Sequence, residues 1–433
     1  MLKKIHFSFL AFFALALFAC GTGTVTGTGP EQPENFEAIT LQPGSNATEV
    51  NFNWYSNKDT ENPKAFVRIL YPNRVAATVT KGTSGSVSET KFRHKVTVKG
   101  LQQGVSYKYQ ISNDSVNWSV AYDYKTVPTG AFKFAVVGDP QLSIGNQDPN
   151  SVFADKTTAE GWAATVGKIV TEGAYFIVSA GDNVDNFSGN ELEYNNLFAP
   201  AGLRNLPFAP AIGNHDANCL FAYHFNLPNE QNTKPLDCSS IGGDWSAANS
   251  DLGNYFYIYN RVLFIALNTS PFPAPYAGSA DGYIAAFDAT IKTAKAANTG
   301  KYDWIIVHHH KSTQSVGNHA ANTDIQAYVN AGFEKLMTTY GVDLVFAGHD
   351  HIFVRTISEG VVYMTITTAS GLKFYPPSIT PDSPKWPAGY VFDAQNKEPE
   401  YTIVEVNGAT MTVTTKTITG KQVDFLTLHK RNL

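Results

Sequence analysis

Residues of the kinds that bind metal ions follow a series of apolar runs in the second part of the chain. The run at residues 132–137 is followed by a Gly-Asp pair, and so is the run at residues 175–180. Glycine at such a place allows a sharp turn and a close approach of a ligand. Aspartate, asparagine and histidine, without cysteine, suit first-row ions such as Fe, Mn and Zn. The candidate residues of this kind are Asp139, Gln141, Asp182, Asn214, His215, His310, His349 and His351.

These motifs differ in how specific they are. A Gly-Asp pair is common in turns, and its ordinary interpretation is structural. The sequence Gly-Asn-His-Asp at residues 213–216 is more specific. So is Gly-His-Asp-His at residues 348–351, where two histidines at i and i+2 reach two ions from one loop. Five separate strand ends with such residues are difficult to explain by packing alone.

The apolar runs indicate the elements that must position these residues. Unbroken runs of this length are typical of strands that are covered on both faces. Helical periodicity lies between them at residues 157–172, 283–297 and 323–340. Alternating strands and helices predict an α/β domain, which we place at residues 131–433. Loops at the carboxyl ends of its strands would bring the candidate residues together. Alternation at residues 401–415 predicts strand structure that completes a sheet.

The chain from residue 36 to residue 128 has a different pattern. Val50, Phe52 and Trp54 alternate with polar residues, and similar stretches follow between turn residues. Short alternating strands predict an antiparallel β-sandwich over residues 36–128. The sequence Leu-Gln-Gln-Gly-Val-Ser-Tyr at residues 101–107 resembles the tyrosine corner of fibronectin type III domains.

In their order along the chain, the five motifs resemble the calcineurin-like metallophosphoesterase superfamily over residues 132–355. The resemblance implies two packed mixed β-sheets flanked by helices, two metal ions and hydrolysis of phosphate esters. The preceding sandwich makes the chain similar to the purple acid phosphatase branch, which places a small sandwich before its metal domain.

The resemblance also assigns ligands residue by residue. It implies two ions that share the bridging ligand Asp182. The further ligands are Asp139 and His351 for one ion, and Asn214, His310 and His349 for the other. Gln141, Asp185 or a water would complete the shell of the first ion.

Two positions depart from the family pattern. The purple branch has an iron-bound tyrosine where this chain has Asp185, so that we expect no charge-transfer colour. The superfamily has a histidine where this chain has Gln141, which is a weaker ligand. The histidine run resembles the purple branch's tryptophan, apolar strand and ligand histidine six residues later, which implies His310 as the ligand, with His309 as the alternative.

The same resemblance implies the chemistry. Two cations would clamp a phosphate and lower the pKa of a bridging water, so that a hydroxide attacks phosphorus. His215 would protonate the leaving oxygen or stabilise the developing charge, and Asp216 would orient His215. His319 is interpreted as a solvated loop residue, with contact to substrate as the alternative.

We therefore expect a phosphomonoesterase that resembles acid phosphatases. A phosphodiesterase or nucleotidase on the same scaffold is the second interpretation, because the shape of the pocket decides between them. A third is a binding or adhesion protein with an inactive metal domain, but such a protein is expected to have lost ligands. The formal net charge of −5 gives no sign of a nucleic-acid partner.

The first residues resemble a bacterial export signal. Lys3 and Lys4 precede an apolar run that ends at Cys20. Residues 1–20 therefore predict a lipoprotein-type signal peptide with lipidation at Cys20, and the alternative is plain cleavage and release. Residues 21–35 predict a flexible linker. We expect an exported bacterial protein that a lipid anchors at the cell envelope.

Two further cysteines follow the Gly-Asn-His motif. In an exported chain, Cys219 and Cys238 are expected to form a disulfide, with two free thiols as the alternative. Residues 217–250 directly follow the motif and are predicted to form a specificity loop over the site.

Overall fold

The computed structural model describes residues 36–430 except 59–62, 73–76, 187–188, 217–218, 232–251, 271–279, 380–390 and 394–395, and the backbone alone at 391–393. All the described residues belong to one compact unit, Gln32–Leu433. The predicted signal peptide, Cys20 and the linker lie outside the described residues. None of the helices in the described part is long and apolar enough to cross a membrane.

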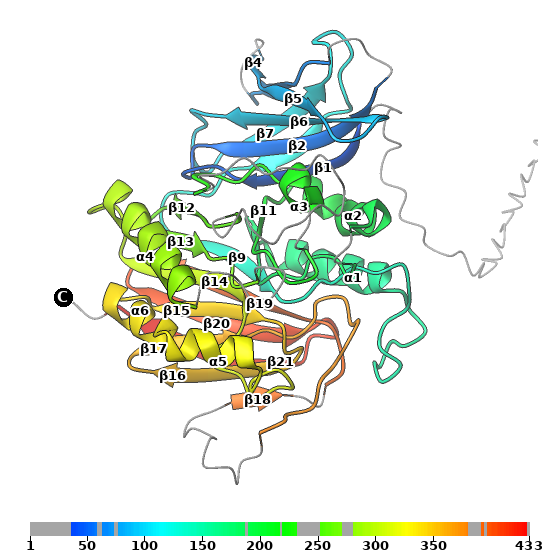
Figure 1. Cartoon of the computed structure of the whole chain (residues 1–433). Coiled ribbons are helices and arrows are strands. Elements are labelled where there is room, and N and C mark those ends of the chain that lie inside the picture. The colour runs from blue at the N-terminus through cyan, green and yellow to red at the C-terminus, as the bar shows by residue number, and fades with distance from the viewer. Residues whose placement is uncertain are drawn as a thin grey trace, which may run out of the picture. The chain divides into compact units, whose positions relative to one another are not determined.

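The first part of the described chain is an all-β sandwich (Figure 1). Its two antiparallel sheets have the orders β1-β2-β6-β5 and β4-β3-β7-β8. The strands are β1 Glu37–Pro43, β2 Val50–Asn57, β3 Phe66–Leu70, β4 Thr78–Lys81, β5 Thr83–Ser86, β6 Lys91–Val98, β7 Ser106–Ser112 and β8 Tyr122–Lys125. Alternate residues such as Phe52 and Trp54 pack into one core. The Oη of Tyr107 accepts the N–H of Gln102 at 2.9 Å, as predicted for a tyrosine corner.

The second part contains two mixed sheets that share one apolar core. Their strand orders are β11-β10-β9-β19-β20-β21 and β12-β13-β14-β15-β17-β16-β18. The strands of the first are β9 Phe132–Val137, β10 Ile177–Ser179, β11 Phe208–Pro210, β19 Glu400–Asn407, β20 Thr410–Thr417 and β21 Gln422–His429. Those of the second are β12 Tyr255–Tyr259, β13 Val262–Ala266, β14 Trp304–Lys311, β15 Leu344–Gly348, β16 Phe353–Ser358, β17 Val361–Thr365 and β18 Val391–Asp393.

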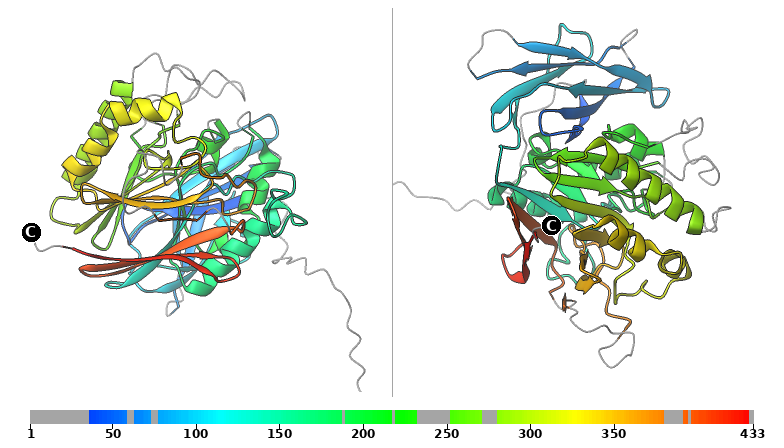
Figure 2. Two further views of the ribbon diagram at one scale, coloured as in Figure 1. Left: turned by 90° about the horizontal axis from the view of Figure 1, so that it is seen from below. Right: turned by 90° about the vertical axis from the view of Figure 1, so that its left-hand side faces the viewer.

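Helices cover the outer faces of both sheets (Figure 2). They are α1 Thr158–Glu172, α2 Glu191–Phe198, the 3-10 helix η1 Ala201–Arg204, α3 Cys219–His224, α4 Ala280–Ala297, α5 Thr323–Asn330 and α6 Phe333–Tyr340. Along β9, Phe134 and Val136 face the other sheet, whereas Ala135 and Val137 pack with Trp162 of α1. β9 is therefore buried on both faces, and the predicted arrangement of two packed sheets flanked by helices is confirmed.

The prediction of a single helix at residues 323–340 is wrong, because the structure contains two helices there. α5 ends at Asn330 and α6 begins at Phe333. Gly332 between them has a φ of 91°, a left-handed conformation that glycine adopts without a steric penalty. Helical periodicity continues across the break, so that it did not reveal the turn.

Candidate metal centre

The predicted ligands follow parallel strands in both sheets. β9, β10 and β11 are parallel neighbours, and so are β13, β14 and β15. Asp139, Asp182 and Asn214 lie beyond the first three strands, while His310 and His349 lie at the ends of β14 and β15. The carboxyl ends of parallel strands meet at one edge, and this brings residues together that are distant in the sequence.

One cluster of ligand atoms surrounds Nε2 of His310. This atom lies 3.1 Å from Oδ2 of Asp182, 3.1 Å from Oδ1 of Asn214 and 3.2 Å from Nδ1 of His349. The ligand atoms of Asp182, His310 and His349 all lie within 4.8 Å of one another, which suits a single ion. On the other side of the ring, Nδ1 of His310 donates to the carbonyl of Ala180 at 2.9 Å, so that Nε2 is presented to the cluster.

The neighbouring histidines of β14 lie outside this cluster. His309 packs against Phe333, with ring centroids 4.9 Å apart. His308 contacts the carbonyl of Ser179 through Nδ1 at 3.0 Å. Burial lowers the pKa of His308 to about 4 and that of His309 to about 3, and both are therefore neutral. The structure thus brings His310, the predicted ligand of the run, into the cluster, and leaves His309 in the core.

Asp139 and His351 lie together beside the first cluster, and Gln141 follows Asp139 by two residues. The Nε2 of His351 lies 3.5 Å from Oδ1 of Asp139, which is 3.9 Å from Nδ1 of His310. Gln141 is buried, and its Oε1 has no hydrogen-bond partner among the described residues. A buried oxygen without a partner is costly, so that this side chain fits a metal ligand.

Five of these residues have a left-handed backbone. The φ angle is 41° at Asp139, 38° at Gln141, 48° at Asp182, 74° at His349 and 48° at His351. Residues with a Cβ rarely adopt this conformation, and they keep it only where the surrounding structure holds them in place. Such strain concentrates at functional sites, which supports this edge of the sheets as the candidate site.

Glycine is required in two of the motifs because ligand atoms contact its backbone. A Cβ at Gly213 would lie 2.0 Å from Oδ1 of Asp182. A Cβ at Gly348 would lie 2.4 Å from Oδ2 of Asp139. The glycines of the Gly-Asn-His and Gly-His motifs therefore serve the close approach of two loops, as well as a turn.

Burial and mutual charge set the protonation of the cluster. Burial lowers the pKa of His351 to about 3 and that of His349 well below its usual range, so that both are neutral imidazoles. Burial also opposes charge on His310, but the carboxylates of Asp182 and Asp139 raise its pKa to about 9. Burial raises the pKa of Asp139 well above its usual range. A bound cation favours ionised carboxylates and neutral imidazoles, and such a cation fits this donor set.

Asp185 is paired with a lysine. Its Oδ1 lies 3.1 Å from Nζ of Lys373, and its N–H donates to Oε2 of Glu193 at 3.2 Å. An ammonium group competes with a metal ion for the same carboxylate. Oδ1 of Asp185 is thus engaged by an ammonium group, whereas Oε1 of Gln141 has no such partner among the described residues.

His215 lies next to the cluster and is oriented by backbone contacts. Its N–H donates to Oδ1 of Asp182 at 2.8 Å, and its ring Nδ1 hydrogen-bonds to the carbonyl of Asp185. The predicted role of Asp216, to orient this ring, is therefore filled by Asp185. Asp216 is buried and accepts hydrogen bonds from the backbone N–H groups of Asn183, Val184 and Gly213. It positions the loops that carry Asp182 and His215.

Sequence reasoning missed Lys373 and Tyr375, and it gave a place at the site only as the alternative for His319. His319 is not a solvated loop residue, because its ring centroid lies 4.3 Å from that of His349 and its Nδ1 lies 3.0 Å from Oδ1 of Asp350. Tyr375 lies with its ring 4.9 Å from that of His351, whose Nδ1 donates to the carbonyl of Lys373 at 2.9 Å. No motif marks Tyr375 or Lys373. The glycine two residues before His319 was the available signal, since a Cβ there would contact Asp350 at 2.6 Å.

The segment after the Gly-Asn-His motif is described in part. Cys219, the first residue of α3, is disulfide-bonded. Cys238 lies outside the described residues, as does most of the predicted specificity loop.

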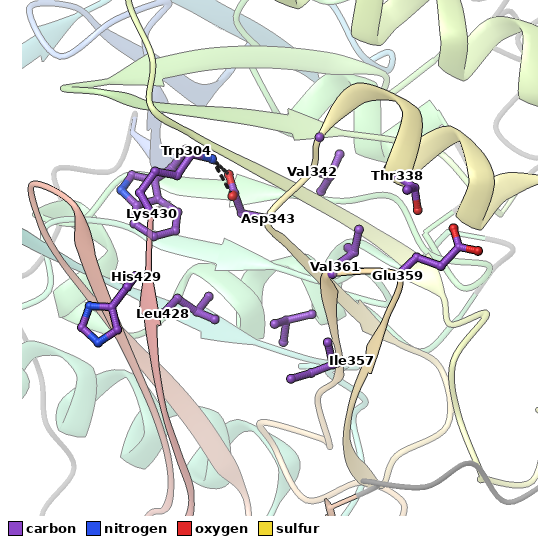
Figure 3. Close-up of a pocket in the computed structure, with 13 residues that line it drawn as sticks. Trp304, Thr338, Val342, Asp343, Ile357, Glu359, Val361, Leu428, His429 and Lys430 are labelled. Atoms are coloured by element: carbon purple, nitrogen blue, oxygen red, sulfur yellow. Dashed lines mark hydrogen bonds and ion pairs between the residues drawn. The ribbon is translucent and has the colours of Figure 1, made fainter. Parts of the chain in front are cut away.

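A pocket of about 470 Å³ lies at the opposite ends of the same strands (Figure 3). Its lining includes Trp304, which begins β14, and Asp343, which precedes β15. Lys430 pairs with Asp343 at 2.6 Å and lies 5.1 Å from the ring centroid of Trp304. None of the predicted ligands lines this pocket. The predicted metal ligands therefore belong to the other edge of the sheets.

Two family matches agree with this geometry. Residues 132–353, just over half of the chain, match the family described as Calcineurin-like phosphoesterase. Residues 36–126 match Purple acid Phosphatase, N-terminal domain. The chain belongs to the calcineurin-like phosphoesterase family. It is a phosphoric ester hydrolase of the metallophosphoesterase superfamily, and its two groups of ligand atoms fit the binuclear metal centre that this family implies.

Individual relatives are distant but cover most of the chain. Tartrate-resistant acid phosphatase type 5 of Mus musculus is 23% identical over 342 residues, which are 72% of this chain and 95% of the relative. The protein of the same name from Sus scrofa is 24% identical over 328 residues, 71% of this chain and 89% of the relative. A solved purple acid phosphatase from seeds of yellow lupin (Lupinus luteus) has a TM-score of 0.65 at 15% identity, covering 92% of this chain and 75% of that chain. This last likeness supports the fold.

Proposed function

We propose that this protein is a phosphomonoesterase, similar to acid phosphatases, that works with two metal ions. The observation that carries the proposal is the edge of the sheets where Asp182, His310 and His349 offer ligand atoms within 4.8 Å of one another, with His215 beside Asp182. The relatives named tartrate-resistant acid phosphatase support the choice of a monoester substrate. Gln141 and Asp185 are departures from the family pattern; Oε1 of Gln141 is buried without a partner among the described residues, whereas Asp185 pairs with Lys373.

The residues present divide into two metal shells. Asp182 would contribute to both, as the bridging ligand that the resemblance implies, and its Oδ2 already lies beside His310. The remaining ligands would be Asp139, Gln141 and His351 for one ion, and Asn214, His310 and His349 for the other. When bound, the two ions would hold the phosphate group and activate a water for attack on phosphorus. We propose Fe, Zn or Mn, which suit nitrogen and oxygen donors.

The rings of His215 and His319 are oriented by hydrogen bonds, so that His215 would protonate the leaving group and His319 would bind the phosphate. Nδ1 of His215 is engaged by the carbonyl of Asp185, so that Nε2 is the nitrogen left to carry a proton toward the leaving oxygen. Nδ1 of His319 is engaged by Asp350 in the same way, and its Nε2 is left to hold a phosphate oxygen. These contacts fix the ring orientation, which is what a proton donor requires.

One assay tests this proposal. The purified protein is stripped of metal, reloaded with Mn, Zn or Fe, and given p-nitrophenyl phosphate or bis(p-nitrophenyl) phosphate. We expect activity on the monoester to vanish on stripping and to return on reloading, without purple colour. We expect Asp182→Ala to lower kcat/KM at least about a thousandfold, since both shells lose a ligand.

Other outcomes of the assay have definite meanings. Activity that survives stripping contradicts the metal-dependent mechanism. A preference for the diester replaces the monoesterase by the phosphodiesterase. A purple protein contradicts the interpretation of Asp185.

We also propose that the protein is exported and anchored at the cell envelope through lipid on Cys20. The support is the basic, apolar and small-residue order of residues 1–20. Expressed in a bacterium, the natural chain is expected in the detergent phase after membrane extraction, and Cys20→Ser in the soluble fraction. Equal partitioning of the two proteins would count against lipidation.

A further inference from the structure

One face of the sheet β1-β2-β6-β5 is polar and yet buried. Phe52 and Trp54 of β2 point into the core of the sandwich, so that their polar neighbours point to the other side. These neighbours are at most 3% exposed: Thr40, Gln42, Asn51 and Asn53. Buried polar side chains need hydrogen-bond partners. Another part of the chain therefore covers this face and supplies partners for Gln42 and Asn51, whereas the amide of Asn53 has no partner among the described residues.

Lys95 of β6 lies on this face and contacts the end of α3. Its Nζ donates to the carbonyl of Ala222 at 2.9 Å and to the carbonyl of Phe225. The last carbonyls of a helix have no partner within it, and a positive charge there is favourable. Lys95 thus caps, from the sandwich, the helix that follows the Gly-Asn-His motif of the metal domain.

Asn226, the residue after Phe225, is held by the same sheet. Its N–H donates to Oε1 of Gln42 at 3.0 Å, and its carbonyl accepts from Nδ2 of Asn51 at 2.7 Å. Its own amide group donates to the carbonyls of Phe52 and Val96 at 3.3 Å each. The backbone that leaves α3 is thereby fixed against β1, β2 and β6.

His224, the last residue of α3, is fixed between the two domains. Its ring stacks on Tyr55 of β2 at 4.4 Å and on Tyr194 of α2 at 4.3 Å. Its Nε2 lies 2.8 Å from Oε2 of Glu191. A helix of six residues is not stable by itself, so that these contacts decide where α3 lies.

We propose that Lys95 is a positioning residue for His215. The sandwich fixes the end of α3, and α3 begins only four residues after His215. The inference rests on the proposed function, in which His215 protonates the leaving oxygen. It assigns the sandwich a part in catalysis, although no described side chain of the sandwich lies among the ligand atoms of the metal centre.

The test uses the full chain and compares Lys95→Met with Lys99→Met. Lys99 is a matched control, because its side chain is 69% exposed and pairs only loosely with Glu49 at 3.7 Å. Turnover is measured on glycerol 2-phosphate, whose alkoxide must be protonated, and on p-nitrophenyl phosphate, whose leaving group needs no proton. We expect Lys95→Met to lower kcat about tenfold on the first substrate and less than about threefold on the second.

Further readouts distinguish a positioning role of Lys95 from a general loss of structure. Metal content and KM should stay within about twofold of the natural protein, since the ligands lie on other loops. In a His215→Ala background, Lys95→Met should add no further loss, because two residues that act through one proton transfer are not additive. Lys95→Arg should restore most of the turnover, since it keeps a cation near the same carbonyls.

Definite results would overturn the proposal. Equal losses on both substrates, loss of metal, additive effects with His215→Ala, or behaviour like Lys99→Met would each contradict it. Should Lys95→Met fail to fold, Asn226→Ala removes another contact of the same segment and must show the same substrate dependence. A natural protein without phosphatase activity would instead refute the proposed function itself.

Discussion

Asp182 is contacted from two directions, and this makes it the central residue of the candidate metal centre. Oδ1 accepts the N–H of His215 and Oδ2 lies beside His310. Burial opposes the ionised form, but His310 and His215 lower the pKa of this carboxyl far enough to keep it charged. An ionised carboxylate is the form that binds a cation, and Oδ2 is the oxygen that faces the ligand atom of His310.

Substitutions of Asp185 and Gln141 are expected to have different effects on metal content. Asp185→Asn should leave two ions per chain, because the carboxylate is already paired with Lys373, and should lower kcat about three- to tenfold by loosening the backbone that orients His215. Gln141→Ala should reduce the affinity of one ion about tenfold or more. Elemental analysis of each purified variant, alongside its turnover, checks both.

One outcome would contradict the assignment of Gln141, rather than Asp185, as a metal ligand. If Asp185→Asn lost one ion while Gln141→Ala kept both, Asp185 would be the ligand, and the lysine pair would be broken when metal binds. The comparison is matched, because the two residues adjoin the parallel bridge between Leu142 and Val184.

The ligands were predictable from the sequence because each stands beside a glycine or within a short motif after a buried strand. Asp139, Asp182 and His349 are examples, and their left-handed backbone explains why the motifs are so restricted. Lys373 and Tyr375 were not predictable in the same way. They reach the site through the path of the loop after β17, and no local pattern encodes that path.

At the scale of elements, continuous apolar runs identified the central strands, since β9 and β14 are buried on both faces. The sequence pattern did not predict two features. The break between α5 and α6 preserves the helical period, and helix α3 is too short to show a period of its own.

Alternation also identified the strands of the sandwich, but it could not show what covers their polar face. Asn51 and Asn53 have the pattern of residues that face water, although both are buried. A period of two tells which residues share a face and leaves open whether that face meets solvent or another domain. The role inferred for Lys95 could therefore emerge only from the packed structure.

At the scale of the whole molecule, the two sheets of the metal domain are joined by an aromatic core. Phe134 and Phe176 stack at 5.2 Å, and Phe264 meets both edge-on at 5.1 and 5.5 Å. At one margin of this core, Arg355 of β16 forms a two-pronged ion pair with Asp424 of β21, at 2.5 and 3.0 Å. The pair joins a strand of one sheet to a strand of the other, and its side chains are only 13% and 8% exposed.

This ion pair makes a prediction about stability. Arg355→Met should lower the free energy of unfolding by about 3–5 kcal/mol, because it leaves the Asp424 carboxylate buried without a partner. The double variant Arg355→Met, Asp424→Leu should recover most of the loss, since removing both charges removes the unpaired one. Arg261→Met is the control: its pair with Asp303 is 57% and 39% exposed and should contribute less than about 1 kcal/mol. Urea unfolding of the four proteins measures these differences, and equal effects of the Arg355 and Arg261 variants would show that burial of the pair between the sheets is not what makes it matter.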